Sequence, residues 1–366
     1  MAGKDIGIDL GTANVLIYVE GQGIVLNEPS VVAFDAKTNK VIAIGQDAFD
    51  MIGRTPGDYR IVRPLRDGVI SDFDVTETML TYFVSKINVK GLMRKPNIMI
   101  CAPTSITEIE RNAIIQVAER AGGARVFLEY EPKVAAFDAG LDIFSPVGNM
   151  VIDIGGGTTD IAVISMGDIV ADDSITIAGD AMTADIIAYL KREVNILIGD
   201  STAEQIKRKI GSVEFKDIPE TIDVRGTNLV DNMPISFTMT SNDVDLALRE
   251  SIEKIVKSVI NVFAKLPPEL SADIIERGIM LTGGGAMLKG LPQLLTQRLK
   301  VPVTLSETPL TNVARGAGML LKRMNINGRF DSKIQNQPTT QEIASAYQRY
   351  VQNNQTAKPS ENNLTN

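Results

Sequence analysis

The segment VIDIGGGTTD, residues 151–160, nearly repeats KDIGIDLGTA, residues 4–13. In each copy an apolar strand carries an aspartate near its end, Asp9 or Asp153, and a glycine-containing turn follows. One such turn alone is usually just a tight hairpin. Two copies this far apart predict an α/β fold of two similar halves, each opening with antiparallel strands that carry the turn.

The rest of the sequence alternates strand and helix patterns. Apolar residues recur at every fourth position from Val75 to Ile87, which predicts a helix with one buried stripe. Ser105 and Glu108 have the spacing of a capping box and predict the start of the next helix. Further amphipathic helices are predicted over residues 182–198 and 244–263.

We predict the following division of the chain. The first domain spans residues 1–142, has a small insert near 33–67 and is completed by about 311–323. The second spans 143–310, with an insert near 180–240. Half of residues 325–366 are Asn, Gln, Ser or Thr, which predicts a disordered tail with at most a short helix around 342–351.

Composition excludes several kinds of chemistry. The chain has no histidine and one cysteine, Cys101, which excludes catalytic triads, zinc sites of the usual ligands and internal disulfides. The net charge of -8 argues against nucleic acid as a partner. No apolar run approaches the roughly 20 residues of a membrane span, and we expect a cytoplasmic protein.

The twin turns suit a phosphate ligand. Glycines let backbone N–H groups converge on phosphate oxygens, and the hydroxyls of Thr12, Thr158 or Thr159 would add donors. Asp9 and Asp153 suit Mg²⁺, which keeps most of its waters and bridges phosphates. Because no GxxxxGK[ST] or complete GxGxxG motif is present, we expect the opposed turns themselves to clamp a nucleoside triphosphate.

Several segments resemble the MreB family of bacterial actin homologues, particularly its Mbl paralogues. They include IGIDLGTAN, GIVLNEPSVVA, RPLRDGVISDF, EPKVAAFDAG, VIDIGGGTTDIAVISMGDIV and LTGGGAMLKGLPQLL. The resemblance runs in order from residue 1 to about 323. It implies the actin-like fold shared with Hsp70 and sugar kinases, with ATP and Mg²⁺ in a cleft between two α/β halves.

The resemblance also implies roles for individual residues. It assigns catalysis to Glu131, Thr158 and Asp153, and water-mediated Mg²⁺ binding to Asp9 and Asp153. It assigns the nucleotide to Asp9, Gly11, Thr12, Ala13, Asn14, Gly155, Gly156, Gly157, Thr158, Glu204, Lys207, Gly283, Gly284 and Gly285.

Simpler interpretations of some of these residues stay open. Glu131 precedes Pro132 and suits a helix N-terminus, and Glu204 with Lys207 has the spacing of a solvated ion pair. The family often has acids where this chain has Thr183 and Tyr130. The ribose contact would then be shared with Asp180 or Asp185.

The segment NVKGLMRKP, residues 88–96, matches the family's membrane-inserting loop, with Leu92 and Met93 as its apolar tip. A turn folded back on its own domain is the alternative. The resemblance therefore implies a filament of identical subunits, with paired protofilaments, on the inner face of the cell membrane. Its partners would be membrane lipid, other MreB paralogues and the shape and wall-synthesis proteins of a rod-shaped bacterium.

Under this interpretation, slow ATP hydrolysis times the polymer and serves no metabolic purpose. Two alternatives within the superfamily are a small-molecule kinase, which usually carries longer insertions, and a chaperone ATPase, which needs a peptide-binding domain after Met324.

Overall fold

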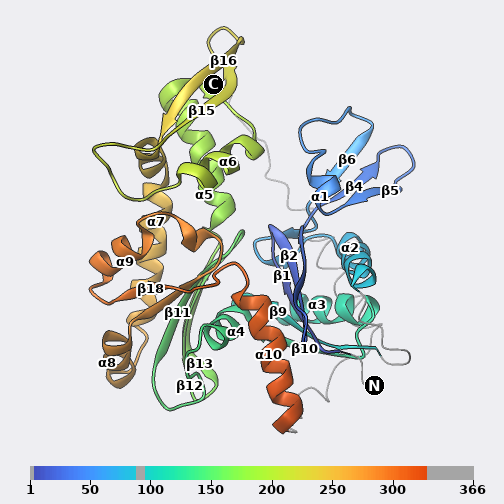
Figure 1. The fold of residues 1–366 in the computed structure, drawn as a ribbon, viewed down its shortest axis with the longest axis vertical. Helices are drawn as coiled ribbons and strands as arrows, with labels where there is room; N and C mark the ends of the chain where they lie inside the picture. Colours follow the sequence, from blue (N-terminus) through green and yellow to red (C-terminus); the bar gives the residue numbers. More distant parts are fainter. Residues whose placement is uncertain (1–3, 88–94, 328–366) are drawn as a thin grey trace, which may run out of the picture.

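The computed structural model describes residues 4–87 and 95–327, whereas residues 1–3, 88–94 and 328–366 lie outside the description. Figure 1 shows two α/β halves side by side, each built around its own sheet. The predicted tail helix over residues 342–351 therefore falls outside the described residues. None of the described helices is long and apolar enough to cross a membrane.

The sheet of the first half has the order β10-β9-β1-β2-β3. β1 runs antiparallel to β2 and parallel to β9. The strands are β1 (Ile6–Leu10), β2 (Asn14–Val19), β3 (Gly23–Pro29), β9 (Asn97–Ala102) and β10 (Arg125–Tyr130). The antiparallel strands predicted near the start of the chain are therefore present.

The sheet of the second half repeats this topology in the order β13-β12-β11-β17-β18. β11 takes the central place of β1, with antiparallel β12 on one side and parallel β17 on the other. The strands are β11 (Asn149–Ile154), β12 (Thr159–Ser165), β13 (Asp168–Ile175), β17 (Ile279–Thr282) and β18 (Val303–Leu305). The predicted fold class, two similar α/β halves, is confirmed.

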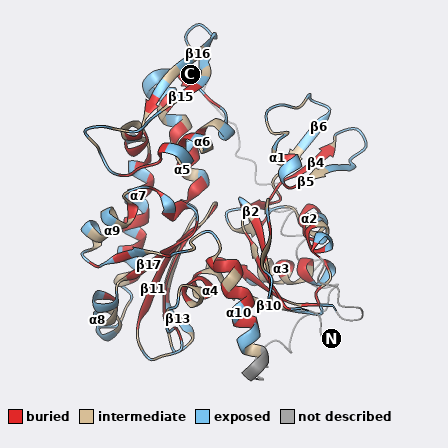
Figure 2. Ribbon diagram, viewed as in Figure 1, coloured by how far each residue is buried: buried red, intermediate tan, exposed pale blue. Residues whose placement is uncertain are grey.

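Helices cover both sheets, and Figure 2 shows that the strands and the inner helix faces are buried. On the first half these helices are α2 (Phe73–Lys86), α3 (Glu108–Arg120), α4 (Glu131–Asp138) and α10 (Asn312–Asn327). On the second they are α5 (Gly179–Tyr189), α7 (Ser241–Phe263), α8 (Pro268–Arg277) and α9 (Leu291–Leu299). The predicted stripes of α2 and α7 are largely buried.

α4 packs against both halves, next to the place where the chain crosses between them. α4 packs Val134 with β9 and α10, while its Ala136 packs against β11 and β12 of the other sheet. The chain leaves the first half after α4 and returns to it at α10. There the Asn312 side-chain amide donates a 2.8 Å hydrogen bond to Asp138 at the end of α4. The two crossing points of the chain are thus tied together.

Smaller elements fall within the predicted inserts. A three-stranded sheet of β4 (Val32–Asp35), β5 (Val41–Ile44) and β6 (Tyr59–Val62) carries the short helix α1 (Gln46–Phe49). A second contains β14 (Ile196–Leu197), β15 (Thr221–Asn228) and β16 (Pro234–Thr240), beside α6 (Asp200–Ile210). The hairpin of β7 (Leu65–Arg66) and β8 (Val69–Ile70) follows the first small sheet. The exact domain boundaries stay a prediction.

Two local predictions were wrong. The capping box before α3 is formed by Thr107 and Glu110, because the Ser105 hydroxyl instead donates a hydrogen bond to Ser174 of the other half. The helix predicted over residues 182–198 ends earlier. α5 passes into a π-helical turn, η1 (Leu190–Val194), and Asn195 then adopts a left-handed conformation from which the chain enters β14.

Candidate functional site

The two aspartate turns face each other between the sheets. A Cβ atom on Gly157 would lie 2.5 Å from the hydroxyl oxygen of Thr12, and one on Gly156 would lie 2.9 Å from the Cβ of Ala13. Only glycine allows this close approach. The structure therefore brings together the two predicted phosphate turns, residues 9–14 and 153–158.

The carboxylates at the base of the turns are electrostatically strained. Burial raises the pKa of Asp9 to about 7. Burial also raises the pKa of Asp153 to about 7, and the negative charges of Asp160 and Asp9 add to the effect. A positive charge arriving between Asp9 and Asp153 would relieve both the desolvation and the repulsion.

The residues present fit a hydrated cation. Within residues 4–87 and 95–327, the buried Oδ1 of Asp153 has no hydrogen-bond partner. The same ranges contain no group of three acidic, histidine or cysteine side chains close enough to hold a metal directly. Mg²⁺ typically takes one or two carboxylates and completes its shell with water and phosphate. Asp9 and Asp153 match that mode of binding.

Glu131 lies at the first turn of α4, directly after β10. Burial raises its pKa well above the usual value, and the charges of Asp160, Asp9 and Asp153 raise it further. The helix N-terminus favours a carboxylate there. The same position also aims Glu131 at the acidic base of the cleft, so its structural and catalytic interpretations are compatible.

Glu204 and Lys207 are more than a solvated pair. The Lys207 ammonium is largely buried and donates hydrogen bonds to the Gly179 carbonyl at 2.6 Å and to the Thr183 hydroxyl at 2.8 Å. It also pairs with Glu204 at 2.6 Å. Burial alone would raise the pKa of Glu204, but the Lys207 charge and the hydrogen bonds lower it overall. The pair thus fixes the start of α5.

The start of α5 in turn contacts the second turn. The amide of Gly179 donates to the Gly155 carbonyl at 3.1 Å, and the amide of Asp180 donates to the Gly156 carbonyl at 2.8 Å. Lys207 therefore binds the residue, Gly179, that itself hydrogen-bonds to the predicted phosphate turn, and Glu204 is paired with Lys207. This places them at the edge of the cleft, and the resemblance assigns both residues to the nucleotide.

Thr183 joins this network, since its hydroxyl donates to Glu204 at 2.9 Å. Burial raises the pKa of Asp180, and the nearby charges of Arg63 and Lys207 offset only part of the rise, so Asp180 lies among the ionisable groups at the cleft. Asp185 instead accepts a hydrogen bond from Ser251 of α7. Of the two acids proposed to share the ribose contact, Asp180 is the better placed.

The glycine cluster after β17 lies against the second turn. Gly283 has φ +86°, which L side chains rarely adopt, and a Cβ atom there would collide with the Ile154 carbonyl and with Asp153. Gly285, in the short helix η2 (Gly285–Met287), packs on the side chain of Ile154. The glycines that the resemblance assigns to the nucleotide here are thus adjacent to Asp153. Leu92 and Met93 lie outside the described residues.

The sequence interpretation missed two contributors. The Asp67–Gly68 turn of the β7–β8 hairpin touches both phosphate turns, since the Gly68 amide donates to the Thr12 hydroxyl at 3.1 Å and Asp67 backbone atoms border Gly157. Asp160 is buried opposite Asp153. Its only sequence signal was its place in the TTD segment of the second turn.

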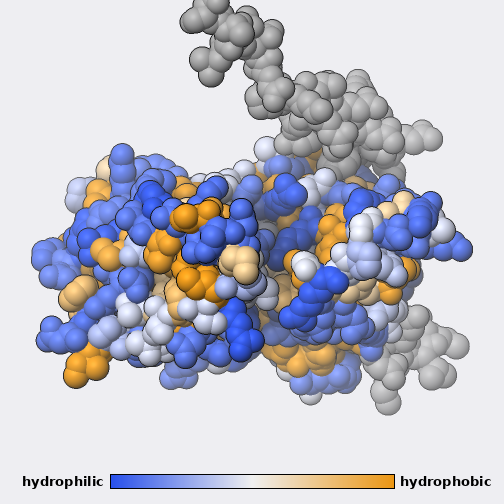
Figure 3. All heavy atoms as spheres, turned by 90° about the horizontal axis from the view of Figure 1, so that it is seen from above, coloured by the Kyte–Doolittle hydropathy of each residue, from blue (hydrophilic) through white to orange (hydrophobic). Residues whose placement is uncertain are grey.

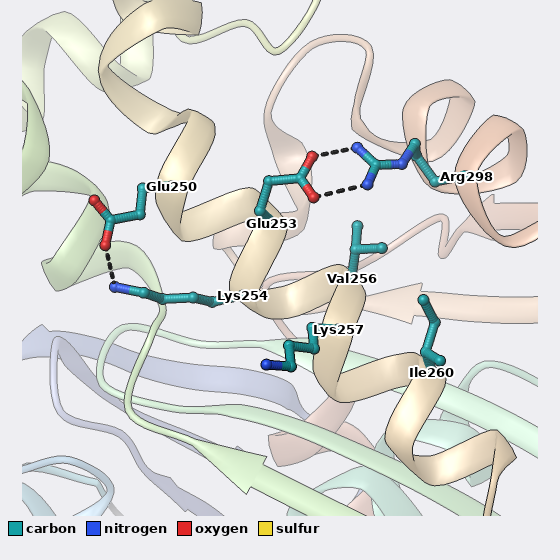
Figure 4. A pocket seen from close by; sticks show the side chains of 7 residues that line it. All are labelled: Glu250, Glu253, Lys254, Val256, Lys257, Ile260 and Arg298. Atoms are coloured by element: carbon teal, nitrogen blue, oxygen red, sulfur yellow. Dashed lines mark hydrogen bonds and ion pairs between the residues drawn. The ribbon is translucent and has the colours of Figure 1, made fainter.

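Two surface cavities lie elsewhere. Figure 4 shows one of about 380 Å³ between α7 and α9, where Lys254 pairs with Glu250 and Arg298 pairs with Glu253. A second, of about 510 Å³, lies where the halves meet and is lined mostly by polar residues, including Thr104, Glu129 and Asp172. Neither cavity contains the aspartate turns.

The repeated sheets, the opposed aspartate turns and the glycine turn beside Asp153 define the actin-like class of two-part folds. Among solved structures, MreB5 of Spiroplasma citri bound to ADP aligns with a TM-score of 0.85 and 39% identity, covering 90% of this chain and 99% of that one. The same protein bound to AMPPNP aligns equally well. The MamK double helical filament, at 20% identity and a TM-score of 0.74, supports the fold alone.

Sequence comparison narrows the class to a family. The profile described as MreB/Mbl protein matches residues 3–329, and the chain belongs to this family. It is 56% identical to the cell shape-determining protein Mbl of Bacillus subtilis, over 89% of this chain and 98% of that protein. It is 47% identical to the cell shape-determining protein MreB of Escherichia coli K12, over 90% and 96%. The predicted resemblance is confirmed.

Proposed function

We propose that this protein binds ATP with Mg²⁺ between its two halves and assembles into filaments that control cell shape. The observation that carries the proposal is the contact between the two aspartate turns, Gly156 with Ala13 and Gly157 with Thr12. A ligand held by both turns closes the halves on each other. The nucleotides in the solved relatives and the family membership support the proposal.

In this proposal each group of the chain has a defined task. Backbone amides of residues 11–14 and 155–158 bind the phosphates, and Asp9 and Asp153 hold waters of the cation. Bound Mg²⁺ would neutralise charge that develops on the phosphates. Glu131 and Thr158 hold the attacking water in line. The raised pKa of Glu131 makes it a stronger base than an exposed glutamate.

Filament formation requires unlike ends that fit each other. The second half has exposed apolar side chains at opposite ends of its long axis. Val230 and Met233 are 78% and 61% exposed beside the β15–β16 turn, and Met166 is 72% exposed at the β12–β13 turn. Figure 3 looks onto the end that carries β15 and β16, where apolar patches lie among polar ones. We propose head-to-tail contact between these ends.

Electron microscopy and pelleting with ATP, with ADP and without nucleotide test this proposal. Filaments should form with ATP, and Val230→Glu with Met233→Glu should abolish them while nucleotide affinity stays unchanged. Ile260→Glu, an exposed position on the side of α7, is the matched control and should still polymerise. Lack of ATP binding by the intact protein would refute the clamp. ADP production stimulated by a sugar or acetate would favour a kinase instead.

Membrane binding through Leu92 and Met93 is a further part of the proposal. Leu92 and Met93, if buried in lipid, would contribute about 1.5–3 kcal/mol each. Lys90, Arg94 and Lys95 would contribute about 1 kcal/mol each at an anionic surface. Association of one subunit with the membrane costs at least about 4 kcal/mol. One subunit would bind weakly, whereas a filament would bind by avidity. At the membrane, such filaments would organise wall synthesis together with shape proteins and MreB paralogues.

Electron microscopy on anionic lipid, with and without ATP, tests the membrane proposal. Leu92→Ser with Met93→Ser should abolish vesicle binding and leave ATP turnover intact. Polymerisation-defective variants should remain off the vesicles. Complete pelleting of monomers with liposomes would contradict the avidity argument.

A further inference from the structure

A buried carboxylate remains that the proposed mechanism does not use. Asp160 lies in β12, directly opposite Asp153 of β11, and is 1% exposed. Because neighbours across an antiparallel pair point to the same face of a sheet, its side chain shares the base of the cleft with Asp153. A buried carboxylate is costly unless several donors satisfy it.

The donors to Asp160 come from both halves. The amide of Thr104, in the segment that follows β9, donates to Asp160 Oδ1 at 2.9 Å. Burial raises the pKa of Asp160, and the nearby hydroxyls of Thr158 and Ser174 partly offset the rise. Beside it, Ser105 donates to Ser174 at 3.2 Å. Asp160 is therefore the centre of a buried polar cluster that joins the first half to the second phosphate turn.

The position of the Thr158 hydroxyl, two residues before Asp160 in the chain and close to its carboxyl group, has a chemical consequence. A threonine hydroxyl has one hydrogen to donate and two lone pairs to accept with. If the hydrogen is committed to Asp160, the oxygen of Thr158 can only accept a hydrogen bond from a nearby water. Glu131, as a carboxylate, also only accepts. A water between them would donate both of its hydrogens and keep a lone pair free for attack.

We propose that Asp160 is a positioning residue that fixes the Thr158 hydroxyl as a hydrogen-bond acceptor toward the attacking water. This inference rests on the proposed ATP hydrolysis and deepens it. The water oxygen forms a bond to the γ-phosphorus, and the bond from that phosphorus to the bridging oxygen breaks. ADP leaves with the electron pair, and the proton of the water passes to Glu131. Asp160 contacts none of the reacting atoms.

Asp160→Asn tests the inference with little change of shape. The amide oxygen still accepts from Thr104, but the amide N–H₂ group would donate toward Thr158 and so remove the acceptor that the proposal assigns to the Thr158 hydroxyl. Turnover at saturating ATP should fall about 10- to 100-fold, while nucleotide affinity changes less than about threefold. Asp173→Asn is the matched control, because Asp173 accepts from Ser258 at 2.6 Å on neighbouring β13, and its turnover should be unchanged.

A double-mutant cycle separates positioning from simple support of the fold. Thr158→Val keeps the side-chain shape and removes the hydroxyl. If Asp160 acts through that hydroxyl, Asp160→Asn should cause no further loss of turnover in the Thr158→Val protein. Melting temperatures with bound nucleotide check that every variant is folded, and Thr158→Val against Thr158→Ser measures the hydroxyl alone if Asp160→Asn does not fold.

Several results would overturn the inference. One is turnover of Asp160→Asn within about twofold of wild type. A second is that adding Asp160→Asn to the Thr158→Val protein lowers turnover as much as it does in the wild type. A third is equal turnover of Thr158→Val and Thr158→Ser. Wild-type protein that binds ATP without hydrolysing it would overturn the role of Asp160 and leave the clamp intact. Wild-type protein that binds no ATP would overturn the proposed function and this inference together.

Discussion

The two phosphate turns occupy equivalent places in equivalent sheets, yet their side chains differ. The first turn has one glycine and the second has three. Opposite Asp9 the neighbouring strand has Leu16, whereas opposite Asp153 it has Asp160. The sheet topology thus positions both turns alike, and the additional buried charge belongs to the second. In the proposed function, the first turn would therefore mainly bind the phosphates, and the second would also position the attacking water.

The largest expected effect comes from filling the space between the turns. In Gly157→Val the new side chain would collide with Thr12 and with the backbone of Asp67. Overpacking typically costs 1–3 kcal/mol, so nucleotide affinity should fall about 10- to 100-fold. Isothermal titration calorimetry measures this change.

Gly199→Val is the control, because a Cβ atom at Gly199 meets nothing within 4 Å. Its nucleotide affinity should match wild type. Wild-type affinity in Gly157→Val would mean that the two turns do not close on a shared ligand.

A smaller effect should appear in the pH dependence of the nucleotide-free protein. The pKa values of Asp9 and Asp153 are raised to about 7, so between about pH 4 and pH 7 the folded state binds more protons than the unfolded chain. The free energy of unfolding should therefore fall as pH rises through this window and level off above it. Melting curves from pH 5 to pH 8 measure the change.

Substitution of either aspartate sharpens this test. Asp9→Asn and Asp153→Asn should each raise the melting temperature of the nucleotide-free protein at pH 8, because an amide carries no charge to bury. Both variants should bind MgATP more weakly. A melting temperature that rises steadily with pH in the wild-type protein would contradict the proposed burial of the two charges.

The smallest effect compares an ion pair of the cleft with one on the surface. In Lys207→Met, Glu204 and the Gly179 carbonyl lose a buried donor, and the loss of stability should be about 1–3 kcal/mol. In Lys37→Met the partner is Asp58, and both side chains of that pair are more than 60% exposed. No measurable change is expected there. Urea denaturation of both variants measures the difference, and equal losses would mean that Lys207 is not structurally special.

Much of this site could be predicted from the sequence, because a duplicated local motif needs no tertiary information. Asp9, Asp153 and the glycines around them followed from repetition alone. The fold class followed from the alternation of strand and helix patterns, which the repeated sheets confirm.

The missing parts depend on contacts between distant segments. Asp160 becomes significant only when the register of β11 and β12 places it opposite Asp153. Ser105 and Thr107 are both acceptable helix caps by spacing, and the contact of Ser105 with Ser174 decides between them. The contact of the Asp67–Gly68 turn with both phosphate turns likewise has no local signal. Sequence patterns predict what each segment tends to form, and packing decides what it meets.

The hydrogen bond between Asp138 and Asn312 has a consequence for motion. The chain passes from one half to the other after α4 and back again before α10, and this bond holds the two passages next to each other. Because the two connections between the halves are adjacent, we expect the halves to move by a hinge rotation about one axis that passes through both connections. A single distance, measured between two spectroscopic labels on either side of the cleft, would then report the opening and closing of the protein.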